Sequence, residues 1–79
     1  MNKLCIAGDV VQVGSSCFAL KTDDIPGVHK SETFVVKYRE NKYRVGEIKM
    51  GMTLCVFGVQ TERPNVIDET NVVFIENHR

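Results

Sequence analysis

The sequence predicts an all-β domain, and its residue inventory and its turn-forming residues are the main reasons. Val occurs twelve times, whereas Leu occurs three times and Ala twice, and β-branched residues favour strands over helices. Six Gly and two Pro divide the chain into pieces of strand length, a pattern typical of a small sandwich or barrel. Seventy-nine residues can bury one core and not two, so residues 1–79 are expected to form a single domain.

The first two strands are expected to form a hairpin. Residues 4–13 are predicted as the first strand, with Gly8 marking a bend or a bulge in its interior. A tight turn that begins at Gly14 leads into the second strand, residues 17–22.

The third strand, residues 32–39, shows the clearest alternation in the chain. A loop rich in turn residues, 23–31, precedes it. One face of this strand carries Phe34, Val36 and Tyr38, and the other carries Thr33, Val35, Lys37 and Arg39.

Two alternatives stay open for residues 40–50, which follow the third strand. Asn41 and Lys42 could turn a hairpin, or residues 40–48 could form one short helix, which Gly46 would destabilise. One sequence does not decide between them.

A polar loop is expected between the last two strands. Residues 52–61 are predicted as the fourth strand, because apolar residues alternate between its two faces. The loop that follows ends with Asp68, Glu69 and Thr70, and residues 71–76 are predicted as the fifth strand.

The composition excludes several classes of protein. At 43% hydrophobic and 25% charged residues, the chain is neither disordered nor collagen-like. No apolar run approaches the roughly 20 residues of a membrane-spanning helix, and the N-terminus does not resemble a signal peptide. The three Cys are odd in number and widely spaced, so we expect neither a set of disulfides nor a metal site formed by paired cysteines. Each Cys is interpreted as a small apolar strand residue. Free cysteines also indicate a reducing, cytoplasmic compartment.

Four short motifs occur in a distinctive order and spacing. Residues 2–10 read NKLCIAGDV, residues 32–36 read ETFVV, residues 49–61 read KMGMTLCVFGVQT, and residues 72–75 read VVFI. Together they resemble the strands of the bacterial single-stranded DNA-binding protein family and its primosomal relatives, including the basic-Gly turn before the fourth strand. The order of the predicted strands also matches the five-stranded OB-fold barrel.

This resemblance implies a non-enzymatic protein that binds single-stranded DNA or RNA through its second and third strands. It also implies a homo-oligomer, a dimer or a tetramer, and a possible partner among replication proteins. The chain departs from the family because it has no Trp and only a short segment between the third and fourth strands.

The distribution of charge supports a binding face. Ten Lys and Arg balance ten Asp and Glu, but residues 29–49 hold six bases and three acids, so this basic segment is at plus three and the remainder at minus three. Single-strand binding needs cations along the phosphates and aromatic faces on which bases stack. The predicted phosphate-binding residues are Lys21, Lys37, Arg39, Lys42 and Arg44, and the predicted stacking residues are Tyr38 and Tyr43. The alternative is a solvated strand face, whose charges prevent aggregation.

Alternation within the second and third strands allows two orientations. In the favoured one, the barrel is filled by Phe18, Leu20, Phe34 and Val36. Lys21, Lys37 and Arg39 then lie together on the outer face, with Tyr38 and Tyr43 at its rim. The opposite orientation exposes Phe34 and Tyr38 for stacking but buries Lys37, which is costly without a partner.

No catalytic site, metal site or cofactor is expected. His29 lies in a predicted loop and His78 near the C-terminus, and neither has a nucleophile and an acid at a suggestive spacing. The acidic pairs at 23–24 and 68–69 are interpreted as turn residues and solubilising charge.

An alternative function belongs to a different class: a protein-interaction adaptor on the same barrel, accessory to a replication or mobile-element complex. Zero net charge and the lack of Trp favour it. Self-association is also expected, because Cys55, Phe57 and Val59 would share one outer face, whereas Phe18 and Phe74 are expected in the core.

Overall fold

The computed structural model describes residues 3–75 and confirms an all-β chain with five strands in one sheet. The strands are β1 (Lys3–Val13), β2 (Cys17–Lys21), β3 (Thr33–Lys37), β4 (Thr53–Gln60) and β5 (Val66–Ile75). Their spatial order is β1-β2-β3-β5-β4, and because β4 pairs back to β1 the sheet closes on itself as a barrel. β3 and β5 pair in parallel, and the other neighbours pair antiparallel. This part of the chain has no helix that is long and apolar enough to cross a membrane.

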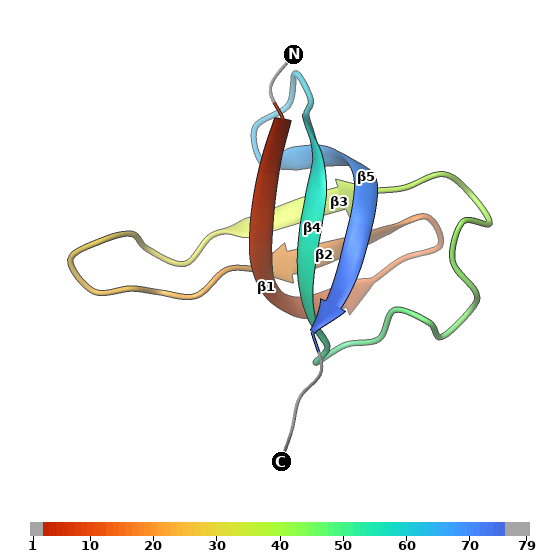
Figure 1. Ribbon diagram of the computed structural model, residues 1–79, viewed down its shortest axis with the longest axis horizontal. Coiled ribbons are helices and arrows are strands. Elements are labelled where there is room, and N and C mark those ends of the chain that lie inside the picture. Colours follow the sequence, from red (N-terminus) through yellow and green to blue (C-terminus); the bar gives the residue numbers. More distant parts are fainter. Residues whose placement is uncertain (1–2, 76–79) are drawn as a thin grey trace.

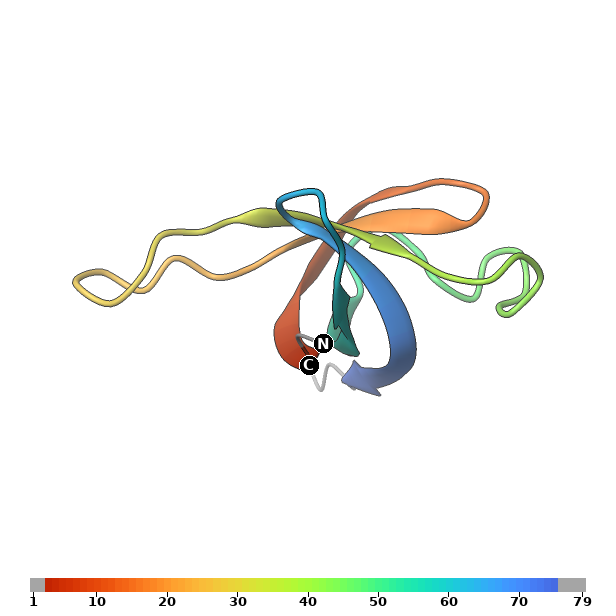
Figure 2. The ribbon, with the colours of Figure 1, turned by 90° about the horizontal axis from the view of Figure 1, so that it is seen from above.

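The barrel has two sides that differ in strand direction. The first part of β1, β4 and most of β5 run upright in Figure 1, whereas β2 and β3 cross behind them. β1 curves round to pair with β2, and β5 starts beside β3, so these two strands bend from one side of the barrel to the other (Figure 2). Two loop arms project in opposite directions, residues 22–32 between β2 and β3 and residues 38–52 between β3 and β4 (Figure 1).

The core is built from the inward side chains of all five strands and one residue of the second arm. Its buried members are Val10, Phe18, Leu20, Val36, Ile48, Leu54, Val56, Ile67 and Val72. This set confirms the favoured orientation of β2 and β3, with Lys21 and Lys37 outside. Phe34 is only half-buried.

Phe74 was expected in the core, and this prediction is wrong, because the side chain is 42% exposed. Alternation along β5 places Phe74 on the same side of the strand as the buried Val72, but Phe74 lies near the end of β5. There it lines an open hollow with Met50 and Met52 instead of being covered.

The first four strands match their predicted bounds to within two residues at each end. The bend predicted at Gly8 is a close crossing of strands, and the register shift of β1 falls between Val10 and Gln12. Asp9 pairs with Thr53 of β4 and with Lys21 of β2, so β1 passes from one partner to the other beside Gly8. A Cβ atom on Gly8 would lie 2.3 Å from the carbonyl oxygen of Lys21, and only glycine fits.

The fifth strand begins at Val66 and not at residue 71, so the predicted polar loop is too long. Val66 and Ile67 pair with β3, and the fully buried Ile67 closes the core. Residues 68–70 continue the strand through a bulge, in which Thr70 has no partner on β4. One side of this strand is exposed and carries charged residues. From sequence alone, such a strand cannot be distinguished from a polar loop. The predicted strand end at Glu76 lies outside the described residues, as do Asn2 of the first motif and His78.

Neither the short helix nor the hairpin predicted for residues 40–50 forms. Three turns follow one another instead, with N–H groups of Lys42, Glu47 and Met52 donating to the carbonyls of Arg39, Arg44 and Lys49. The third residues of these turns, Asn41, Gly46 and Gly51, have φ angles of 66°, 82° and 89°. A right-handed helix needs negative φ at every residue, so these positions interrupt it.

Candidate functional site

The outward side chains of β2 and β3 form one continuous surface, which we call the β2–β3 face. It consists of three directly opposed pairs, Cys17 with Lys37, Ala19 with Val35, and Lys21 with Thr33. The centre of the face is therefore apolar, and each end carries one lysine.

A hollow of about 720 Å³ covers the Lys37 end of the β2–β3 face and reaches the turn between β4 and β5. Val35 and Lys37 line it from β3, and Glu62 and Arg63 line it from the turn. A second hollow of about 220 Å³ shares Val35 with it and extends toward β1. The two hollows give the face a concave floor that an extended ligand could follow.

Arg63 is a functional candidate that the sequence interpretation missed. The predicted binding residues do not include Arg63, yet it lines the hollow together with Lys37. The usable sequence signal was its place between the fourth and fifth strands, because loops at that position border the binding face of OB barrels.

Acidic residues from other strands stand beside the lysines of the β2–β3 face. Lys21 has Asp9 of β1 as its cross-strand partner, and Lys37 has Asp68 of β5. Neither acid belongs to the basic segment. Of the two lysines only Lys37 belongs to residues 29–49, so at this face the fold places one acid beside the positive charge of that segment.

Two predicted binding residues, Lys42 and Tyr43, contact Glu69. The Lys42 ammonium forms an ion pair with Glu69 Oε1, and the Tyr43 hydroxyl donates a hydrogen bond to Oε2. The Glu69 side chain is fully buried. Its interpretation as a solubilising loop residue is therefore wrong, because this carboxylate fastens the 38–52 arm to β5.

The two predicted stacking residues pack against the core. The ring centroids of Tyr38 and Tyr43 lie 5.0 Å apart in an edge-on arrangement, and Tyr38 lies 6.0 Å from Phe18. Both rings are half-buried at the rim of the barrel. Desolvation by burial is the main cause that raises the pKa of each hydroxyl. Their stacking on bases stays a prediction.

The other two predicted binding residues, Arg39 and Arg44, are exposed on the 38–52 arm. Among the described residues, neither arginine has a carboxylate within 4.0 Å that would form an ion pair. The Arg44 N–H donates to Glu47 Oε1 at 3.0 Å, which orders the turn and leaves the guanidinium outside. The structure thus brings Lys37 and Arg63 together and leaves Arg39 and Arg44 on a separate arm.

The described residues form no metal site that would indicate a function, and comparison with known proteins supplies no function either. Over residues 3–75, no group of three or more His, Cys, Asp or Glu side chains is placed to hold a metal ion. No family model, curated protein or solved structure matches the chain. The β2–β3 face and the two arms are then the features from which a function can be argued.

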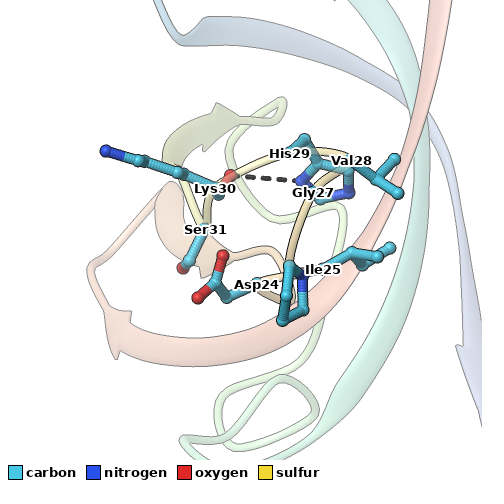
Figure 3. Close-up of a pocket in the computed structure, with 8 residues that line it drawn as sticks. Asp24, Ile25, Gly27, Val28, His29, Lys30 and Ser31 are labelled. Atoms are coloured by element: carbon cyan, nitrogen blue, oxygen red, sulfur yellow. Dashed lines mark hydrogen bonds between the residues drawn. The ribbon is translucent and has the colours of Figure 1, made fainter.

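The tip of the 22–32 arm forms a further hollow, of about 600 Å³, lined by residues 24–31 (Figure 3). The carbonyl of Ile25 accepts N–H groups of Val28 and His29 at 2.9 and 3.0 Å, which closes the turn. The side chains of Ile25 and Val28 extend to the same side in Figure 3, and Lys30 points away. Val28 is 73% exposed, so the arm presents an apolar tip.

We expect the Tyr43 hydroxyl to make the protein less stable at alkaline pH. Burial, followed by the hydrogen bond from Tyr43 to Glu69, raises the pKa of Tyr43 above its ordinary value of 10.0. The folded protein therefore holds this proton more tightly than the unfolded chain, so the stabilisation is complete below pH 10 and falls as the pH rises further. Urea unfolding between about pH 8 and 11 should show this decline. The Tyr43→Phe variant should show a shallower one, and equal slopes in the two proteins would contradict the assignment.

Proposed function

We propose that the chain is an OB-fold barrel that binds single-stranded nucleic acid, DNA or RNA, over the β2–β3 face. The resemblance to bacterial single-stranded DNA-binding proteins implies this function. The closed order β1-β2-β3-β5-β4, with an opening hairpin, supports the OB assignment. The observation that carries the proposal is the hollow over this face, which Lys37 and Arg63 line together with Glu62 and Asp68.

In this proposal the strand lies along the hollow, with its phosphates beside Lys37 and Arg63 and continuing toward Lys21. The apolar floor, Ala19 and Val35, contacts sugars and base edges. Because Asp9 and Asp68 stand beside the lysines, few counterions are released on binding. We therefore expect weak affinity with a shallow dependence on salt.

Charge reversal at the hollow tests the proposal. Lys37→Glu combined with Arg63→Glu should lower the affinity for a fluorescent oligo-dT about tenfold or more at low salt, because two phosphate contacts become repulsive. Fluorescence anisotropy measures this affinity, and a salt titration gives the number of phosphate contacts. The matched control is Lys3→Glu, which reverses one exposed charge at the start of β1, on the other side of the barrel.

Two results would refute nucleic-acid binding at this face. One is a wild-type protein that shows no salt-sensitive binding at high micromolar concentration. The other is a double variant that binds as tightly as Lys3→Glu does.

A second candidate is the protein-interaction adaptor, and the two arms favour it. Their exposed apolar residues include Val28 at 73%, Met50 at 68% and Val45 at 106% relative exposure. Arm contacts of this kind would persist at high salt, unlike phosphate contacts. A partner that stays bound at high salt and is lost from a Val28→Ser, Val45→Ser variant, with no oligonucleotide binding, would favour the adaptor. The homo-oligomer stays a prediction, for which the 40% exposed Phe57 on β4 is the support.

A further inference from the structure

Two of the three cysteines are neighbours on the outer surface of the β1–β4 pair. The Sγ atoms of Cys5 and Cys55 lie 3.2 Å apart, although the residues are 50 positions apart in the sequence. Cys5 is directly opposite Phe57 and Cys55 is directly opposite Ala7, so the two thiols meet diagonally across the strands. Both are free thiols, Cys5 exposed and Cys55 partly so. As a small apolar strand residue, Cys5 would gain little at this exposed position.

We propose that Cys5 and Cys55 form a two-thiol site that hydroperoxides oxidise to a disulfide between β1 and β4. The Cys5 thiolate attacks one peroxide oxygen, the O–O bond breaks, and the leaving oxygen takes a proton to give water or an alcohol. Cys5 is then a sulfenic acid. The Cys55 sulfur attacks the Cys5 sulfur, the S–O bond breaks, and the departing hydroxide takes the Cys55 proton to form water. Two thiols are oxidised and one peroxide is reduced.

The difference in exposure between the two thiols assigns these two roles. Cys5 is the more exposed, so a hydroperoxide reaches its sulfur first, and Cys55 lies beside it to attack the oxidised sulfur. The hydrogen bond with Cys5, followed by burial and by the charge of Cys5, also raises the pKa of Cys55. Cys5 is the attacking thiol and Cys55 the resolving thiol.

The fold keeps the third cysteine away from this pair. Cys17 belongs to β2 and to the β2–β3 face, and β2 lies on the opposite side of the barrel from β4 (Figure 2). The sulfurs of Cys5 and Cys55 need to approach by about 1 Å to reach a disulfide length. Diagonal neighbours in a sheet are about 7–8 Å apart, which exceeds the usual Cα separation of a disulfide, so β1 and β4 must also shift toward each other as the bond forms. The folded protein should therefore select one of three pairings.

Peptide mapping after treatment with hydrogen peroxide tests the proposal in the wild-type protein. Titratable thiols should fall from three to one, no disulfide should link two chains, and the bond should join Cys5 to Cys55. A protease that cleaves before Asp resolves all three cysteines, because Asp9 separates Cys5 from Cys17 and Asp24 separates Cys17 from Cys55. Dithiothreitol should restore all three thiols.

The unfolded chain provides the matched control. In guanidinium, loop closure favours a disulfide between Cys5 and Cys17, the pair closest in sequence. If the folded protein instead forms the disulfide between Cys5 and Cys55, the fold has brought these two thiols together. The Cys17→Ser variant should retain the bond, and Cys55→Ser should accumulate sulfenic and sulfinic acid at Cys5 instead. The proposal is overturned if the folded wild type forms another pairing, forms linked dimers, or is oxidised at each thiol without a bond. The wild-type map alone decides this even where a variant fails to fold.

Discussion

Gly8→Ala is expected to destabilise the protein by about 3 kcal/mol or more, the upper end of the usual cost of overpacking. The new Cβ would lie 2.3 Å from the carbonyl oxygen and 2.8 Å from the carbonyl carbon of Lys21. These are backbone atoms of a paired strand, so no side-chain rotation relieves the clash, and β1 must separate from β2. A domain of this length has about 4 to 12 kcal/mol of total stability, so the loss is a large fraction of it.

Thermal unfolding measures this effect. A loss of that size should lower the Tm by roughly 12 °C or more in a small domain. The matched control is Gly14→Ala, because its Cβ would meet the Cys17 sulfur at 3.0 Å, a side-chain atom that can move, and the Cys17 carbonyl oxygen at 3.4 Å, which is an ordinary van der Waals contact. Similar melting temperatures for the two variants would show that β1 and β2 do not approach so closely at Gly8.

Glu69→Ala should cost about 2 kcal/mol, since a hydrogen bond to a charged group contributes about 1.5 to 3 kcal/mol. The Glu69 carboxylate is fully buried and binds both Lys42 and Tyr43. Without it, the Tyr43 hydroxyl loses its acceptor and the 38–52 arm loses its attachment to β5. Lys42 is 30% exposed, so its charge can turn toward water, which limits the loss.

Two further variants separate the charge of Glu69 from its hydrogen bonds. Glu69→Gln keeps an acceptor for Tyr43 and should fall between the wild type and Glu69→Ala in the urea midpoint. Asp68→Asn changes the neighbouring exposed carboxylate and should alter stability by no more than about 0.5 kcal/mol. If Asp68→Asn proves as damaging as Glu69→Ala, the effect comes from the strand's net charge and not from the buried contact.

Period-two alternation predicted the strands well where one side of the strand is apolar. β2 and β3 are cases in point, because Phe18, Leu20 and Val36 fill the core and the lysines lie outside. The start of β5 could not be predicted in the same way. Its residues Asp68 and Glu69 are charged, and the partner that buries Glu69 comes from residues more than twenty positions away.

The candidate site was predicted less completely than the fold. Alternation within the second and third strands correctly placed Lys21 and Lys37 on one face. It contained no information on Asp9 and Asp68, which become neighbours of those lysines only through strand pairing. Local sequence also gave no indication that Tyr43 would find an acceptor in Glu69. Contacts between segments distant in the sequence decided each of these outcomes.

Acids of β5 become neighbours of bases in the basic segment, Asp68 of Lys37 and Glu69 of Lys42, only when the barrel folds. The local charge balance of this segment is therefore a property of the folded state. An unfolded chain presents residues 29–49, with six bases and three acids, as an uncompensated polycation. A polyanion that binds this segment in the unfolded chain more tightly than it binds the folded face draws the equilibrium toward the unfolded chain. Affinity measured on a destabilised preparation would therefore report how much protein has lost its β5 contacts, and an increase in binding would be a sign of damage.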